Sequence, residues 1–158
     1  MKKKSNNNDD APNVLVTLNL LRVLVRYPQQ LRNIFEINLV NVPTVAWKRL
    51  IPQLFSRLNY PDSFVRDYVT NLLIRIAKDY PQLILYSVIV DENIYQRKSL
   101  STHGSDKDES QNDIEEDDDI GQQENVVAIQ NSFRLIYNVL SETNAHAVGQ
   151  VKLFVHEL

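Results

Sequence analysis

The stretch WKRLIPQLFSRLNYPDSFVRDYVTNLLIRIAKDYPQLILY, residues 47–86, decides the fold that we predict for this chain. Its apolar residues recur at the i, i+3, i+4 and i+7 spacing of an amphipathic helix. One stripe comprises Leu50, Ile51, Leu54, Phe55 and Leu58, and a second comprises Phe64, Val65, Tyr68, Val69, Leu72, Leu73, Ile76 and Ala77. Pro61 and Pro81 each precede a helical pattern, where a missing N–H costs little. The stretch therefore predicts an αα-hairpin and the start of a third helix, as in helical solenoids.

Two more helices are predicted before this stretch. Residues 13–27, NVLVTLNLLRVLVRY, place valines and leucines on one helical side, over a length that favours a helix over a strand. The Tyr27-Pro28 pair ends this helix, because the residue before a proline avoids the α region. Residues 28–42 form the second helix, whose apolar face comprises Leu31, Ile34, Phe35 and Leu39.

Three further features predict how helices begin and bend. Thr44 is the expected N-cap of the helix that carries Trp47, since a threonine hydroxyl can accept a bond from a free N–H there. Pro52 lies inside that helix and predicts a kink, because the apolar stripe continues in phase beyond it. Residues 81–90, PQLILYSVIV, suit a strand or a buried helix, and their helical neighbours favour the helix.

Residues 91–123 differ sharply in composition from what precedes them. Their acidic residues include those at 106, 108, 109, 113, 115, 116, 117, 118 and 119. A block of like charge repels itself, so we predict a disordered acidic loop that is an insertion or a linker. Candidate phosphorylation sites for an acidophilic kinase in this loop are Ser101, Thr102, Ser105 and Ser110.

The two ends of the chain differ in the same way. Residues 1–12, with a lysine triplet followed by Asn and Asp, have nothing to bury and are predicted to be disordered. Residues 124–158 resume a helical pattern, interrupted by a turn at 141–145, that stops without a C-cap glycine. We therefore expect a piece of a larger protein, in which helices 13–90 dock against more helices at both ends.

Composition excludes several classes of protein. The chain is 43% hydrophobic and 23% charged, as in soluble globular proteins, and no apolar run is long enough for a membrane span. It has no cysteine, which excludes disulfides and thiolate chemistry and fits a reducing compartment. A net charge of −3 gives no general attraction to nucleic acid. The cytoplasm is the expected location, and the lysine triplet leaves the nucleus open as an alternative.

No motif for catalysis, metal binding or cofactor binding is found. The histidines at 103, 146 and 156 are not in metal-ligand register, and the pair Glu142 and His146 matches an ordinary contact on a helix surface. The sequence has no Walker A loop, no HRD or DFG tripeptide and no nucleophile elbow. We therefore expect a non-enzyme without cofactor or metal, in which Trp47, Phe55 and Tyr86 are packing anchors.

The same residues carry a family resemblance. The segments concerned are TLNLLRVLVRY (17–27), AWKRLIPQLFSRLNYP (46–61) and VRDYVTNLLIRIAKDYPQLILY (65–86). Together they resemble the end of the FAT domain of phosphatidylinositol-3-kinase-related protein kinases, where a Trp-containing helix with an IPQL-type core precedes a PQxLxY-like segment. SETNAHAVGQVKLFVHEL, residues 141–158, looks like the lead into the helical bundle before the kinase domain. The resemblance implies an all-α fold of HEAT- or TPR-like solenoid pairs.

The resemblance also implies a role. Within the family, PQLFSRLNYP and DYPQLILY look most like the kinase of nonsense-mediated mRNA decay, with the TOR kinases as runner-up. Such a parent phosphorylates Ser/Thr-Gln sites on an RNA helicase, and its kinase motifs are not in this chain. The implied partners are the kinase domain, the remaining solenoid and regulatory protein subunits, without direct contact to nucleic acid or membrane. The alternative is a free-standing helical adaptor that uses the acidic loop as its ligand.

Overall fold

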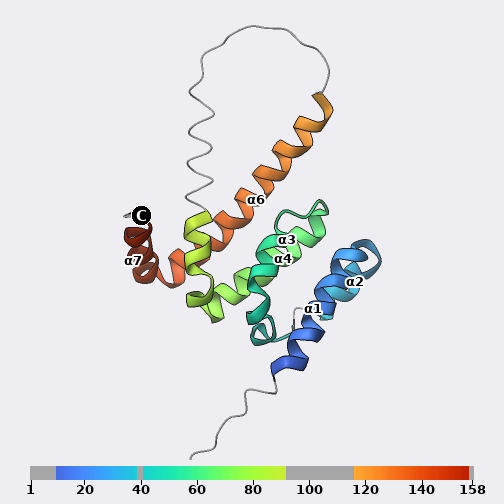
Figure 1. Ribbon diagram of the computed structural model, residues 1–158, viewed down its shortest axis with the longest axis horizontal. Coiled ribbons are helices and arrows are strands. Elements are labelled where there is room, and N and C mark those ends of the chain that lie inside the picture. The colour runs from blue at the N-terminus through green and yellow to red at the C-terminus, as the bar shows by residue number, and fades with distance from the viewer. Residues whose placement is uncertain (1–9, 39–40, 92–115, 157–158) are drawn as a thin grey trace, which may run out of the picture. The chain divides into compact units, whose positions relative to one another are not determined.

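The computed structural model describes residues 10–38, 41–91 and 116–156, and every regular element in these ranges is a helix (Figure 1). The predicted all-α class is therefore confirmed. Two compact units divide the chain, Met1–Asp79 and Tyr80–Leu158. The stacking of helix pairs into a solenoid stays a prediction.

The first unit contains four α-helices and one 3₁₀ helix among its described residues. They are α1 (Asp10–Arg26), α2 (Pro28–Asn38), η2 (Thr44–Leu50), α3 (Ile51–Arg57) and α4 (Ser63–Asp79). The start of α1 at Asp10 precedes the predicted start at Asn13, so residues 10–12 are helical rather than disordered. Pro12 is tolerated in this first turn because the first N–H groups of a helix have no intrahelical partner.

The segment around Trp47 differs from the single kinked helix that Pro52 predicts. Residues 44–50 form the 3₁₀ helix η2, and an α-helix begins anew at Ile51 with Pro52 in its first turn. A proline has no N–H to continue the hydrogen bonds of the preceding turn, so the helix restarts there. The N-cap prediction for Thr44 is also wrong, since Pro43 occupies that position and Thr44 lies inside η2.

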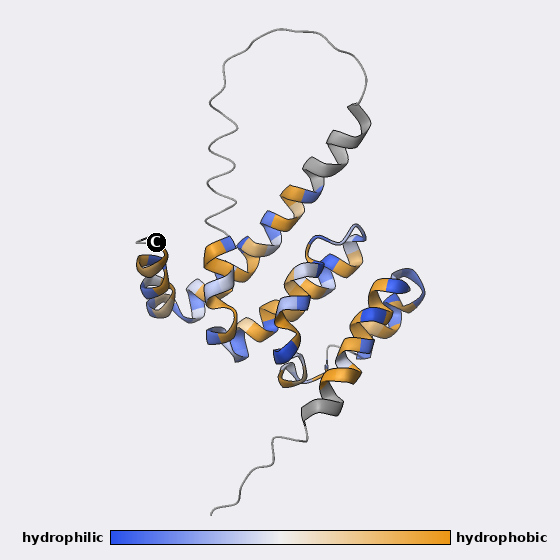
Figure 2. Ribbon diagram, in the orientation of Figure 1, coloured by the Kyte–Doolittle hydropathy of each residue, from blue (hydrophilic) through white to orange (hydrophobic). Residues whose placement is uncertain are grey.

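The core of the first unit forms where α1, η2 and α3 pack together with α4. The most deeply buried side chains here are Leu24, Trp47, Leu54, Leu58, Val65, Val69, Leu73 and Ile76. Hydrophobic and hydrophilic residues are interspersed along each of these helices, as amphipathic faces require (Figure 2). A hydroxyl group fixes one corner of the core, because buried Thr44 donates to Asp79 Oδ2 over 2.5 Å.

The second unit begins with the proline-led segment that the sequence predicts to be helical. Its described elements are the 3₁₀ helix η3 (Pro81–Leu83), the helical residues 85–91, α6 (Glu116–Thr143) and α7 (Ala145–His156). The helix predicted over 81–90 is thus present, with a 3₁₀ first turn. Asn144 separates α6 from α7, and its N–H donates to the carbonyl of Leu140 over 2.7 Å.

The predicted acidic loop needs a correction at both of its borders. Asp91 is helical, and α6 begins at Glu116 rather than near residue 124. Residues 116–119 are all acidic, and negative charge in the first turn of a helix is stabilised by the helix dipole. The rest of the predicted loop, residues 92–115, lies outside the described residues.

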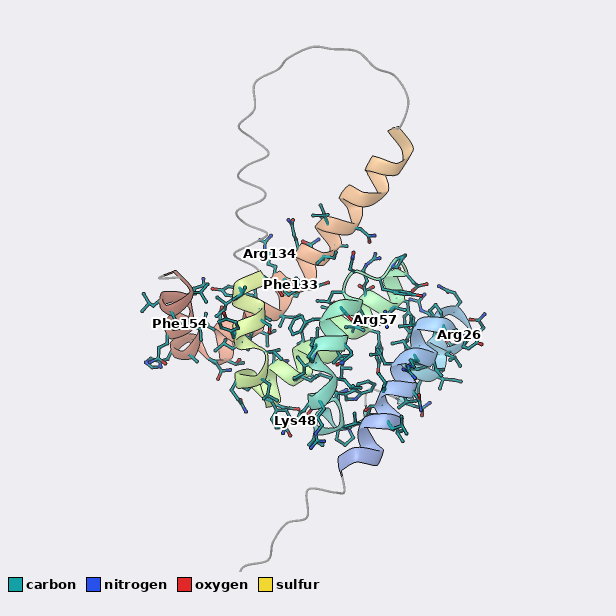
Figure 3. All side chains as sticks on the ribbon, viewed as in Figure 1. Arg26, Lys48, Arg57, Phe133, Arg134 and Phe154 are labelled. Carbon is teal, nitrogen blue, oxygen red and sulfur yellow. The ribbon has the colours of Figure 1, made fainter. Side chains whose placement is uncertain are left out.

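The apolar stripe of α6 and α7 is only partly buried. Ile129, Phe133, Ile136 and Leu140 of α6 are buried, as is Val148 of α7, whereas Phe154 is exposed (Figure 3). In the first part of this unit the buried apolar residues are Ile84, Leu85, Val88 and Ile89. None of the described helices combines the length and hydropathy that crossing a membrane demands.

Candidate functional site

A groove between α2 and α4 is the candidate site in the first unit. It has a volume of about 280 Å³ and is lined by Arg32, Glu36, Phe64, Asp67, Tyr68, Asn71, Leu72 and Arg75. The lining residues combine aromatic rings with arginines and carboxylates. Such a lining suits recognition of a polypeptide or a small polar ligand through packing and hydrogen bonds.

Aromatic packing holds the two helices at the groove. The rings of Phe35 on α2 and Tyr68 on α4 meet edge to face, with centroids 5.7 Å apart and planes at 89°. Phe64 lies 6.3 Å from Tyr68 on the same helix. Burial raises the pKa of the Tyr68 phenol, and the nearby Arg75 charge partly opposes that effect. The phenol therefore stays protonated and can donate a hydrogen bond at neutral pH.

The two arginines of the groove are held by neighbours. Arg32 Nε lies 3.0 Å from Glu36 Oε1 one turn along α2, and its guanidinium carbon lies 5.1 Å from the centroid of the Phe64 ring. Arg75 donates to the carbonyl of Val42 over 2.9 Å. The arrangement fixes charge and aromatic surface for binding. In the described parts of the chain, no group of three His, Cys, Asp or Glu side chains is placed to hold a metal ion.

The three predicted packing anchors lie in different environments. Trp47 is 1% exposed, and its indole N–H has no hydrogen-bond partner among the described residues, so it acts through packing alone. Phe55 on α3 is half-buried. Tyr86 is 53% exposed, so it is not a packing anchor within the described residues. Its neighbours Leu85 and Val88 occupy the buried side of that helix, which leaves Tyr86 on the other side.

The other residues singled out in the sequence do not join this groove. Glu142 is exposed near the end of α6 and His146 is exposed in the first turn of α7. The phosphorylation candidates Ser101, Thr102, Ser105 and Ser110 lie outside the described residues.

Sequence reasoning missed the groove because its walls are distant along the chain. Tyr68 matched the apolar stripe of its own helix, and only the packing of α2 against α4 places it beside Phe35. The local signal that was available is the i, i+4 spacing of Arg32 and Glu36, which is common on exposed helix faces.

Comparison with known proteins gives relatives for part of the chain. No protein-family model matches it. The chain is 46% identical over 88 residues to the serine/threonine-protein kinase SMG1 of Danio rerio, an alignment that covers 56% of this chain and 2% of that protein. It is 41% identical over 93 residues to Smg1 of Drosophila melanogaster, covering 59% of this chain and 3% of that protein.

Weaker similarity extends to another kinase of the same family. The chain is 36% identical over 53 residues to the serine/threonine-protein kinase TOR of Oryza sativa, covering 34% of this chain and 2% of that protein. The chain thus spans only 2–3% of the length of these curated relatives. The resemblance to the phosphatidylinositol-3-kinase-related kinases is thereby confirmed, and within that family the chain is similar to a segment of the SMG1 kinases and, more weakly, of the TOR kinases.

Proposed function

We propose that this chain is a non-catalytic helical scaffold segment of a large serine/threonine protein kinase of this family. The observation that carries the proposal is the 46% identity over 88 residues to a kinase of which the alignment covers 2%. The sequence has neither an HRD nor a DFG tripeptide, which phosphoryl transfer in protein kinases requires. The segment therefore contributes packing surface, and another part of the parent performs the reaction.

The proposed position is the C-terminal part of the FAT domain, with residues 141–158 leading into the bundle before the kinase domain. Helices throughout the described residues and the buried Trp47 in an IPQL-type context support this position. In this position, the segment helps to clamp and orient the kinase domain. Its proposed partners are that domain, the remaining solenoid and regulatory protein subunits.

The proposed process is nonsense-mediated mRNA decay, in which the parent phosphorylates an RNA helicase. The similarity to SMG1 kinases supports this process over a TOR-type function, since it is higher and longer, 46% over 88 residues against 36% over 53. The cytoplasm is the proposed location, with the nucleus as the alternative.

Sequencing the transcript beyond the codon for Leu158 tests the proposal. We expect the reading frame to continue into a helical bundle and a kinase domain that contains HRD and DFG. A stop codon at that point would instead favour a free-standing adaptor that uses residues 91–123 as its ligand.

A binding measurement complements the transcript. The chain is expected to co-precipitate with a separately expressed kinase region of the parent or of an SMG1 relative. A cooperatively folded monomer without affinity for that region would contradict the scaffold role.

A further inference from the structure

Helix α1 has apolar residues on two sides, and only one of them is covered in the described structure. On the covered side Leu21 and Leu24 are buried, where α1 packs against η2 and α2. On the other side lies a row that we name the α1 stripe, which comprises Val16, Leu20, Val23 and Tyr27. Of these, Val16 is 58%, Val23 40% and Tyr27 45% exposed, and Leu20 is half-buried.

The spacing of the α1 stripe is that of a helix-packing surface. Its members follow one another at i, i+4, i+7 and i+11, which keeps them on one side of a helix over three turns. Tyr27 follows α1 directly, and its N–H donates to the carbonyl of Val23 over 3.0 Å, so the helical turn carries it onto the same side. Another helix packs its ridge of side chains along such a row.

Positive charge borders the stripe. Arg22 and Arg26 are both exposed one turn apart on the neighbouring side of α1, and Figure 3 shows Arg26 at the outer edge of the α1–α2 pair. The Arg26 guanidinium carbon lies 5.7 Å from the centroid of the Tyr27 ring. Within the described residues neither arginine forms an ion pair, and residues 13–26 contain no acidic side chain.

We infer that the α1 stripe docks an amphipathic helix whose apolar face is bordered by Asp or Glu, supplied by polypeptide outside residues 1–158. The apolar row sets the shape of the partner, and the bordering arginines set its charge, since opposite charges across an interface favour docking. The inference rests on the proposed scaffold role and names the surface and the chemistry through which that role is exerted.

The charge pattern also disfavours a second copy of this chain as the occupant. A symmetric pair of α1 helices uses the same patch on both copies. The stripe is centred next to Arg22, so an antiparallel pair places the two Arg22 side chains beside each other. Like charges in that position repel, whereas an acidic helix provides partners for both arginines.

The test measures binding of two designed peptides to the full chain by fluorescence anisotropy. Both peptides contain about three heptads with leucine at a and d, and they carry either glutamate or lysine at e and g. We expect the glutamate peptide to bind about tenfold more tightly than the lysine peptide, with an advantage that shrinks at high salt. The double variant Arg22→Glu/Arg26→Glu is expected to reverse the preference.

Two further variants separate the apolar contribution. Val16→Ser/Val23→Ser is expected to weaken binding of the glutamate peptide at least about tenfold, because both side chains lie in the proposed contact. The matched control Leu153→Ser changes an exposed apolar residue on α7 and is expected to leave binding unchanged. Thermal melting of each variant checks that the fold is retained.

Three outcomes would overturn the inference. They are equal affinity for the two peptides, unchanged binding by Val16→Ser/Val23→Ser, and a dimer of the chain that this double variant converts to a monomer. The kinase-region co-precipitation separates this inference from the proposed function. Retained co-precipitation without a peptide preference contradicts the α1 stripe alone, and a peptide preference without co-precipitation contradicts the scaffold role alone.

Discussion

Helices α1 and α4 have the same length, 17 residues, and the same kind of apolar periodicity, yet they are buried very differently. The buried residues of α4 are Phe64, Val65, Val69, Thr70, Leu72, Leu73, Ile76 and Ala77. In α1, by contrast, Leu15, Val16 and Val23 are exposed. The difference shows that α1 carries more apolar surface than the first unit covers, whereas the neighbours of α4 match its apolar face.

This difference separates stability from docking. Each Å² of apolar surface removed from water contributes about 25 cal/mol, so the buried face of α4 stabilises the first unit while the exposed side of α1 does not. Substitutions on α4 should therefore unfold the unit, and those on the outer side of α1 should change binding only.

A matched pair of truncations tests this separation with the largest expected effect. Leu73→Ala on α4 removes a side chain that is fully buried and should lower the free energy of unfolding by about 2–5 kcal/mol. Leu15→Ala on α1 removes the same atoms from an exposed position and should change it by less than about 0.5 kcal/mol. Chemical denaturation of both variants measures the two values, and equal losses would refute the comparison.

Two buried threonines sharpen the comparison at the level of hydrogen bonds. Thr44 links η2 to the end of α4 through Asp79, whereas the Thr17 hydroxyl on α1 bonds within its own turn to the Val14 carbonyl at 3.1 Å. Thr44→Val should cost about 1.5–3 kcal/mol, the range for a bond to a charged group, and Thr17→Val about 0.5–1.5 kcal/mol. The control is Asp79→Asn in the Thr44→Val background, which should add little if Thr44 acts through Asp79. A larger loss for Thr17→Val, again by denaturant titration, would contradict this ranking.

Helix α7 extends the comparison to the second unit, since it also exposes apolar residues, Leu153 and Phe154. Gly149 lies inside this helix, and a Cβ added there meets no atom within 4 Å. Gly149→Ala should therefore stabilise the chain by about 0.5–1 kcal/mol, because alanine loses less backbone entropy in a helix. Differential melting measures the gain, and a loss of stability would mean that the exposed side of α7 is covered in solution.

The helices themselves follow from local sequence, and the features that the sequence does not predict are non-local or depend on fine backbone geometry. The 3.6-residue periodicity of α4 and the breaks at Pro61 and Pro81 are encoded within a few residues. The 3₁₀ form of η2 has nearly the same apolar spacing as an α-helix, so periodicity does not distinguish them. The bond between Thr44 and Asp79, and the groove between α2 and α4, join residues more than thirty positions apart, so they depend on tertiary packing.

The groove residues Arg32 and Glu36 provide the smallest expected effect and the last comparison between α2 and α4. Their ion pair at 3.0 Å joins two side chains that are each about half exposed, so water screens it. A double-mutant cycle with Arg32→Gln and Glu36→Gln should give a coupling of about 0.3–0.5 kcal/mol that falls at high salt. Arg32→Gln alone should cost more than Glu36→Gln, because Arg32 also lies over the Phe64 ring of α4. Equal single-variant costs would show that the contact between Arg32 and Phe64 adds nothing to the packing of α2 on α4, leaving the aromatic pair Phe35 and Tyr68 as its principal side-chain link.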